Sequence, residues 1–431
     1  MNQGRMKKRF PMVLLLLTVV LTLFAGVLAL NFTTGEKKME QSVERLYAAA
    51  DPAFARAMGV LLGPAIVPGN RFEVLLNGDR IFPAMLTSIR DAKKTITFES
   101  YIYWSDAIGK EFADALAERA RAGVKVHVLL DWVGSNKLDA AQLAAMEAAG
   151  VEVRKFHKPA WYSLARMNNR THRKVLVVDG KVGYTGGVGI AGLWTGDAHD
   201  PQHWRDTHFR AEGPVVAQMQ AVFLDNWIKA TGTVLHGDDY FPALPAAGSD
   251  AAQMFSSSPS GGSDSMHLMY LLAITAAQHT IHLSSAYFVP DQLSTQALVA
   301  ALKRGVKVQI IVPGEHSDAA IVQSASRARW GDLLVAGAEI HEYQPTMYHC
   351  KVLIIDSLMV SVGSTNFDTR SFRLNDEANL NIYAADFARQ QVEIFSADLL
   401  RSRRVSLEEW QQRPLAEKLM EQAASLIGSQ L

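Results

Sequence analysis

Two short stretches of the sequence carry the same reactive residues at the same spacing. In chain order they are His172, Lys174, Asp179, His349, Lys351 and Asp356. An imidazole can act as a nucleophile or carry a proton near neutral pH, and a nearby ammonium attracts a phosphate oxygen. Because alternate residues of a strand project from one face, each His should lie beside its Lys. The spacing therefore predicts phosphoryl chemistry.

The duplication is what makes this pattern specific. A single His near a Lys on an apolar strand is commonly a surface residue or a satisfied core residue. Here both copies follow H-x-K-x4-D-x6-G-[G/S], and they end in Gly186-Gly187 and Gly363-Ser364. We expect these small pairs to let a ligand approach the backbone closely. Two matching copies indicate a functional site.

Buried strands are expected to position both motifs. The apolar quartets at 175–178 and 352–355 are typical of strands that are buried on both faces. Asp179-Gly180 predicts a hairpin turn into the next strand. Cys350, between His and Lys, should face away from the site and pack in the core.

The regions around the motifs also repeat, since Gly123-Val-Lys-Val recurs as Gly305-Val-Lys-Val. Strands alternate with helices in both halves, which predicts an α/β fold. We expect two similar α/β/α domains, with mixed sheets and helices on both faces, packed pseudo-symmetrically. The expected segments are a basic stub and anchor at 1–30, a stem at 31–70, a first domain at 71–231, a linker at 232–263, a second domain at 264–395 and an amphipathic tail at 396–431.

The N-terminal segment predicts a single-pass membrane anchor. Four basic residues between Arg5 and Arg9 precede an uncharged run at 11–30. At about 1.5 Å per residue this run would cross a bilayer core of roughly 30 Å. A cleaved signal peptide is the alternative, although the run exceeds the usual apolar region of about 7–15 residues. The basic residues predict a cytoplasmic N-terminus and a catalytic body on the outer side of the membrane.

The C-terminal residues predict an amphipathic helix. One helical face would carry Leu415, Leu419, Ala423, Leu426 and Ile427. We expect this face to dock on the body, with a membrane surface as the alternative.

Composition narrows the substrate class. The 431 residues include 43 basic and 43 acidic side chains. Proteins that bind nucleic acid usually carry a basic excess, so the balance argues against a nucleic-acid substrate. Cys350 is the only cysteine in the sequence, which excludes an internal disulfide and a cysteine-built metal site.

Across about residues 70–400 the sequence resembles the phospholipase D superfamily, whose signature is the duplicated HxKx4Dx6G[G/S] pattern. The resemblance implies that the two motifs meet between the halves in one site that needs no metal or other cofactor. It implies that His172 attacks phosphorus and that His349 protonates the leaving alcohol and later activates the acceptor. Lys174 and Lys351 would hold the phosphoryl oxygens.

The resemblance also implies supporting residues around each motif. A carboxylate about thirty residues downstream should orient each His, and Asp206 and Glu377 stand there, with Asp200 and Asp376 as alternatives. The superfamily often has Asn three residues after the first glycine, but Gly189 takes this place in the first motif. The expected phosphate-binding and supporting residues are Gly187, Asp206, Ser364, Asn366 and Glu377.

Three wider stretches, at 203–214, 366–377 and 401–410, resemble the bacterial cardiolipin synthase branch. This resemblance implies transfer of a phosphatidyl group from one phospholipid to the alcohol of another, with phosphatidylglycerol as substrate and cardiolipin as product. The expected place is the bacterial inner membrane. Hydrolysis to phosphatidic acid is the alternative, and a phosphodiesterase or nuclease of the same superfamily is less favoured. The sequence does not indicate an oligomeric state.

Overall fold

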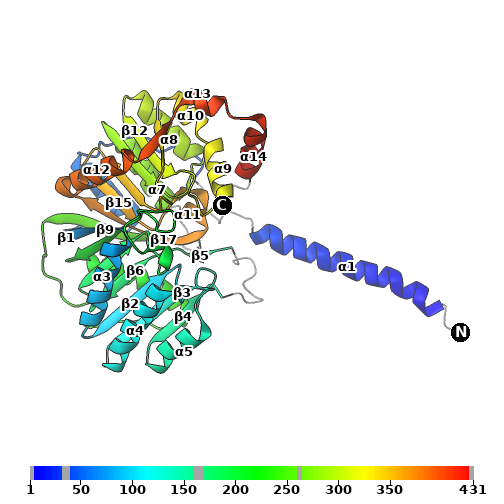
Figure 1. Cartoon of the computed structure of the whole chain (residues 1–431), viewed down its shortest axis with the longest axis horizontal. Helices are drawn as coiled ribbons and strands as arrows, with labels where there is room; N and C mark the ends of the chain where they lie inside the picture. The colour runs from blue at the N-terminus through cyan, green and yellow to red at the C-terminus, as the bar shows by residue number, and fades with distance from the viewer. Residues whose placement is uncertain (1–3, 32–38, 159–167, 260–264, 427–431) are drawn as a thin grey trace.

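One large mixed sheet runs through both halves of the chain (Figure 1). This computed structural model describes residues 4–31, 39–158, 168–259 and 265–426. The strands of the first half are β1 (Val67–Leu76), β2 (Thr95–Ser100), β3 (Lys125–Asp131), β4 (Glu152–Phe156), β5 (Arg170–Thr171), β6 (Val175–Val178), β7 (Val182–Gly186) and β8 (Thr207–Glu212). Those of the second half are β9 (Asp250–Ser257), β10 (Thr280–Ser285), β11 (Phe288–Val289), β12 (Lys307–Pro313), β13 (Glu339–Tyr343), β14 (Lys351–Ile355), β15 (Met359–Gly363), β16 (Phe367–Asp368), β17 (Asn375–Tyr383) and β18 (Ser402–Val405).

The order of strands is repeated in the two halves. Across the sheet it is β4-β3-β2-β6-β7-β8-β1-β9-β17-β15-β14-β10-β12-β13-β18. Counted outward from the central antiparallel pair β1–β9, both halves place their first, seventh, sixth, fifth, second, third and fourth long strands in turn, and β18 adds one more strand at the edge of the second half. The pairs β2–β3, β3–β4, β10–β12 and β12–β13 are parallel, and the neighbouring pairs are antiparallel. The predicted mixed α/β fold is confirmed.

Helices cover both faces of the sheet. The helices of the first half are α3 (Asn77–Asp91), α4 (Ala107–Arg121), α5 (Ala140–Ala148) and α6 (Val215–Thr231). Those of the second half are α7 (Ser265–Ala276), α8 (Gln292–Lys303), α9 (Ala320–Ala328), α10 (Gly331–Val335), α11 (Thr369–Arg373), α12 (Ala385–Leu399), α13 (Leu407–Gln411) and α14 (Leu415–Leu426). In β6, Leu176 packs with α3 and α4, whereas Val175 and Val177 pack with α6. The motif strand is therefore buried on both faces, as its apolar quartet predicts.

A single hydrophobic core joins the halves on the face covered by α6 and α12. It includes Val175 and Val216 from the first half and Val352 and Phe395 from the second. Cys350 belongs to the same core, which confirms that its thiol faces away from the motif His and Lys. Because this core is shared, the two motifs are held at a fixed distance from each other.

Two of the expected segment boundaries are wrong. The predicted linker contains β9, which pairs with both β1 and β17 in the middle of the sheet. Its run Ala-Ala-Gln-Met-Phe-Ser lacks apolar alternation because neighbouring strands and helices bury both faces. The predicted stem contains the start of β1 at Val67 and the helix α2 (Pro52–Leu62), whose Phe54 and Met58 pack in the core of the second half.

The C-terminal helix docks on the body through an unexpected face. α14 packs against α9 through Ala424, and the buried Glu421 of α14 pairs with Arg413 at 2.8 Å. Leu415 and Leu419 keep 72% and 62% of their surface exposed. The predicted docking face is wrong because Ala424 packs with Val322 and Ala325 of α9, while Leu415 and Leu419 face away from the body. Ile427 lies outside the described residues.

The N-terminal helix α1 (Gly4–Asn31) extends away from the body (Figure 1). Its large apolar side chains between Met12 and Phe24 are exposed. Within the described parts of the chain, no helix combines the length and the apolar character that crossing a membrane requires. The structure does not confirm the predicted transmembrane span.

Candidate active site

The two motifs meet where the halves join. The backbone of each motif pairs there with a segment of the opposite half. β5 pairs in parallel with the start of β17, which brings the first motif onto a strand of the second half. The amide of His172 donates to the carbonyl of Asp376 at 2.8 Å. The amide of His349 donates to the carbonyl of Arg205, also at 2.8 Å. Each acceptor directly precedes one of the candidate orienting carboxylates.

Consequently each His takes its carboxylate from the opposite half. His172 Nδ1 lies 3.0 and 3.1 Å from the two carboxylate oxygens of Glu377, and His349 Nδ1 lies 2.7 Å from Asp206 Oδ2. The spacing of about thirty residues suggests a partner within the same half, and this pairing is wrong. The separation of residues along the chain could not reveal this exchange of partners. The exchange depends on how the segments that begin β8 and β17 meet the motif of the opposite half.

The alternative carboxylates are engaged elsewhere. Asp376 accepts a hydrogen bond from His157 Nε2 at 3.1 Å and lies 3.9 Å from the buried guanidinium of Arg173. Asp200 pairs with His203 at 2.8 Å near the surface. Neither contacts a motif His, so the structure favours Asp206 and Glu377 as the orienting residues.

Burial sets the protonation of the motif side chains. Burial lowers the pKa of His172 to about 4 and that of His349 to about 3. Burial likewise lowers the pKa of Lys174 to about 7, and it lowers that of Lys351. Burial disfavours charge on Glu377 as well, but the facing His172 and Lys174 hold the pKa of its carboxyl below its usual value. A phosphodiester anion between these cations would favour their charged forms.

The two lysines follow the same pattern in both halves. Lys174 Nζ donates to the carbonyl of His172 at 2.8 Å, and Lys351 Nζ donates to the carbonyl of His349 at 2.7 Å. Lys351 Nζ also lies 3.1 and 3.2 Å from the ring nitrogens of His349. Each Lys therefore lies beside its His, as the i, i+2 spacing predicts.

The motif aspartates do not belong to this arrangement. Asp179 accepts hydrogen bonds from the amides of Lys93, Lys94 and Thr95 at 2.6–3.1 Å. Asp356 does the same for residues 278–280 at 2.7–2.8 Å. Both lie at the far end of the motif strand, where each ties the hairpin turn to the start of a neighbouring strand. We correct their expected catalytic role to a structural one.

Substituting Asp179 by alanine should therefore lower stability and leave the chemistry of the folded enzyme nearly unchanged. Three backbone amides would lose a charged acceptor, which we expect to cost about 2–3 kcal/mol in the free energy of unfolding. Denaturant titration measures this change, and Asp91→Ala, at an exposed position nearby, serves as the matched control. A large loss of turnover at wild-type stability would contradict the structural role.

The small residues of the motifs make room for the orienting carboxylates. A Cβ added to Gly187 would come 2.3 Å from Asp206 Oδ1. Ser364, at the matching position, donates through its hydroxyl to Glu377. The expected close approach of a ligand to the backbone is wrong for both, since neither lines the pocket between the motifs.

Gly189 and Asn366 differ for a structural reason. A Cβ on Gly189 would come 2.7 Å from Ile102 Cβ and 3.1 Å from the indole of Trp194, so this glycine makes room for that ring. Trp194 Nε1 donates to Asp206 at 3.0 Å. Asn366 instead lines the pocket, and its buried Oδ1 makes no hydrogen bond to the described residues.

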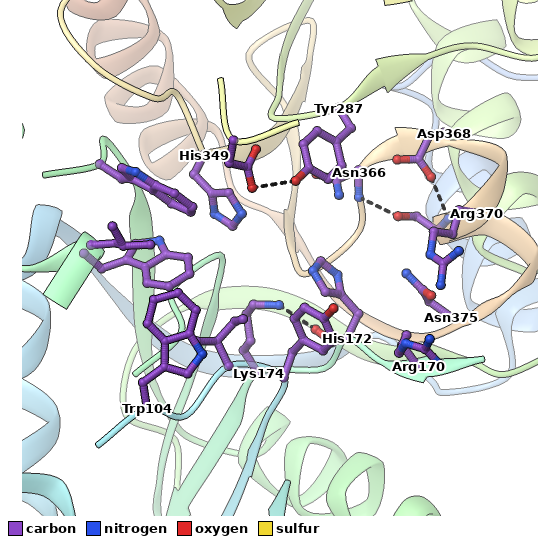
Figure 2. A pocket seen from close by; sticks show the side chains of 17 residues that line it. Trp104, Arg170, His172, Lys174, Tyr287, His349, Asn366, Asp368, Arg370 and Asn375 are labelled. Carbon is purple, nitrogen blue, oxygen red and sulfur yellow. Dashed lines mark hydrogen bonds between the residues drawn. The ribbon is translucent and has the colours of Figure 1, made fainter. Parts of the chain in front are cut away.

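The pocket between the motifs has a volume of about 280 Å³ (Figure 2). His172, Lys174 and His349 line it, and the two imidazoles come from opposite sides. Sequence reasoning missed several further lining residues. Trp204 and Arg370 fall within stretches that resemble the cardiolipin synthase branch, whereas nothing in the sequence pointed to Trp104, Trp194, Arg170, Tyr287 or Asp318.

Comparisons with known proteins agree with this geometry. A family model described as "Cardiolipin synthase, PLD-like domain" matches residues 85–199 and 270–399. Cardiolipin synthase A of Pseudomonas syringae is 34% identical over 90% of this chain and 81% of its own length. A cardiolipin synthase of Geobacillus kaustophilus is 35% identical over 83% of this chain and 72% of its own length.

A solved structure shares the fold. The phosphatidylserine synthase of Haemophilus influenzae superimposes with a TM-score of 0.68 at 14% identity, over 88% of this chain and 100% of that chain. Two copies of the motif, an active-site pocket between the halves and relatives matched over most of their length lead to one assignment. The chain belongs to the cardiolipin synthase family of the phospholipase D superfamily.

Proposed function

We propose that this protein transfers a phosphatidyl group from one phosphatidylglycerol to the hydroxyl of another, forming cardiolipin and releasing glycerol. The observation that carries this proposal is the pair of buried imidazoles that line one pocket, each held by a carboxylate of the opposite half and each next to its motif lysine. The names of the relatives supply the product, since several are cardiolipin synthases.

The reaction would proceed in two displacements at phosphorus. The Nε2 atom of one His attacks, a nitrogen–phosphorus bond forms, and the bond to the head-group oxygen breaks as the other His gives this oxygen a proton. The acceptor hydroxyl then returns a proton to the second His and attacks phosphorus, which releases the first. Lys174 and Lys351 would stabilise the charge on the non-bridging oxygens. His172 as the attacking residue stays a prediction.

A lipid assay tests the proposal. The purified full-length protein is incubated with phosphatidylglycerol vesicles, and the lipids and free glycerol are measured. We expect cardiolipin and glycerol in equal amounts. Phosphatidic acid without cardiolipin would contradict transfer and would instead support hydrolysis. Cleavage of single-stranded DNA that is lost in His172→Ala would support the nuclease alternative.

We further propose that the N-terminal segment holds the enzyme at the bacterial inner membrane, with the N-terminus in the cytoplasm and the catalytic body outside. The basic residues before the apolar run support this orientation. The exposed apolar side chains between Met12 and Phe24 would be covered by lipid. Carbonate extraction of membranes and protease accessibility of the body in spheroplasts test both statements; release by carbonate would contradict anchoring.

A further inference from the structure

The two orienting carboxylates are supported in different ways. Glu377 accepts hydrogen bonds from the hydroxyl of Ser364 and from Asn375 Nδ2, the latter at 3.1 Å. Asp206 faces Gly187 at the position that matches Ser364, and even a Cβ there would come 2.3 Å from Asp206 Oδ1. The first half therefore cannot support its carboxylate with a hydroxyl at this position.

The indole of Trp194 supplies a hydrogen bond to Asp206 instead. Trp194 Nε1 donates to Asp206 Oδ2 at 3.0 Å, and the same oxygen lies 2.7 Å from His349 Nδ1. Asp206 Oδ1 accepts the amide of Thr207 at 2.8 Å. Both oxygens are thus engaged, and the carboxylate cannot rotate without breaking a hydrogen bond. Trp194 and Asp206 are almost fully buried, so water is kept away from these contacts.

The backbone ties this indole to the segment that carries Asp206. Trp194 ends the short turn η2 (Gly192–Trp194), which follows β7. The amide of Trp204 donates to the carbonyl of Leu193 at 2.7 Å, and Trp204 stands two residues before Asp206. The donor and the acceptor of the indole hydrogen bond are therefore held by neighbouring backbone segments.

The ring of Trp194 also packs against the imidazole that Asp206 orients. The ring centroids of Trp194 and His349 lie 5.3 Å apart, with their planes at 78°. Ser371 takes the matching position of the second half, eight residues after the first glycine of the motif, and its amide donates to Asp368. The support by an indole is therefore specific to the His349 side.

Charges of both signs act on His349. Burial, and then the repulsion by Lys351, lower the pKa of this imidazole, and Lys174 of the other motif lowers it further. Asp206 acts in the opposite direction. The indole N–H directs the positive end of its dipole at Asp206 and offsets part of the carboxylate charge. Removing this N–H should therefore raise the pKa of His349.

Two other titratable groups lie near this pair. Burial lowers the pKa of His208 to about 4, so its ring is neutral near pH 7 although the charge of Asp206 acts on it. Burial lowers the pKa of Lys351, and Asp318, which accepts a hydrogen bond from Tyr287 at 2.7 Å, is among the carboxylates that oppose this. Within the described part of the chain, neither His208 nor Asp318 is a donor to Asp206.

We propose that Trp194 is a positioning residue for proton transfer at His349. Its N–H holds the Asp206 carboxylate in the place from which it orients the imidazole, and its ring limits how the imidazole can turn. Trp194 acts through these two residues and takes no part in bond making itself. This inference rests on the proposed function, in which both imidazoles act at phosphorus.

The pH dependence of Trp194→Phe tests this role. Phe keeps an aromatic ring and removes the N–H, and we expect cardiolipin formation from phosphatidylglycerol vesicles to fall about tenfold. The limb of the pH–rate profile that His349 controls should move to higher pH by about 0.5 unit, because a group with a raised pKa titrates at higher pH. The same limb should move to lower pH in Asp206→Asn. Trp410→Phe, which removes an indole donor to the carbonyl of Arg327 outside the pocket, is the control and should keep the wild-type rate and profile.

Double variants test whether Trp194 acts through Asp206. In an Asp206→Ala background the change Trp194→Phe should cost little further activity, because the N–H has lost its acceptor. In a Glu377→Ala background, where the carboxylate of His172 is lost, the same change should still cost about tenfold. Single-turnover measurements of cardiolipin formation give both ratios, and thermal unfolding of each variant checks that the fold is kept.

The outcomes separate this inference from the proposed function. A tenfold loss with an unmoved pH profile, or an equal loss in the two double variants, would mean that Trp194 only maintains the pocket and would overturn the inference. Because the position of a pH limb does not depend on the amount of folded enzyme, a destabilised variant still gives an answer. If the wild type releases phosphatidic acid and no cardiolipin, the proposed function fails, and the same profiles measured on this hydrolysis still test Trp194.

Discussion

Substitution of either His172 or His349 by alanine is expected to lower cardiolipin formation at least a thousandfold. One imidazole forms the covalent bond to phosphorus and the other moves the proton, so each displacement needs both. The expected loss is of the order seen when members of a catalytic unit are removed, about 10³–10⁶-fold. His203→Ala, which removes a partly exposed imidazole near the site, is the control and should retain most activity.

A second substrate separates the two roles. A p-nitrophenyl phosphodiester carries a leaving group that needs no proton. The variant without the proton carrier should therefore still release one equivalent of nitrophenol and accumulate the phosphorylated enzyme. The variant without the nucleophile should release none. The resemblance assigns these outcomes to His349→Ala and His172→Ala, respectively, and the reverse result would exchange the roles. Wild-type turnover in either variant would contradict a catalytic role for that His.

Glu377→Gln and Asp206→Asn should each lower turnover about 10²–10³-fold. Both carboxylates are almost fully buried and lie within 3.0 Å of an imidazole, so their charge favours the imidazolium that forms during proton transfer. Loss of the carboxylate further lowers the pKa of the attached His. A proton donor with a lower pKa loses its proton at lower pH. The alkaline limb of the pH–rate profile should therefore move to lower pH in the variant that has lost the carboxylate beside the proton-carrying His.

The same two variants test the crossed pairing. With the p-nitrophenyl substrate, Glu377→Gln should resemble a defect in His172, and Asp206→Asn should resemble a defect in His349. A pairing within each half would give the opposite correspondence. Asp200→Asn is the matched control, since this carboxylate contacts His203 and not a motif His. Wild-type turnover in Glu377→Gln would contradict an orienting role for this residue.

Local periodicity in the sequence was sufficient to predict the parts of the fold that depend on residues close together in the chain. The quartets at 175–178 and 352–355 form buried strands, and Cys350 turns into the core. The strand β9 was missed because burial on both faces removes the apolar alternation. The docking face of α14 was missed because it is a single small residue, Ala424, packed on α9, and not the apolar stripe.

The identity of the reactive side chains was determined by the sequence alone, because each His stands two residues before its Lys and needs no distant segment to bring the two together. Their partners were decided only by the tertiary structure. The exchange of Glu377 and Asp206 between the halves depends on strands of the two halves that meet at one junction. The role of Asp179 depends on the amides that the fold brings within 3.1 Å of it. Long-range contacts of this kind leave no periodic signal in the chain.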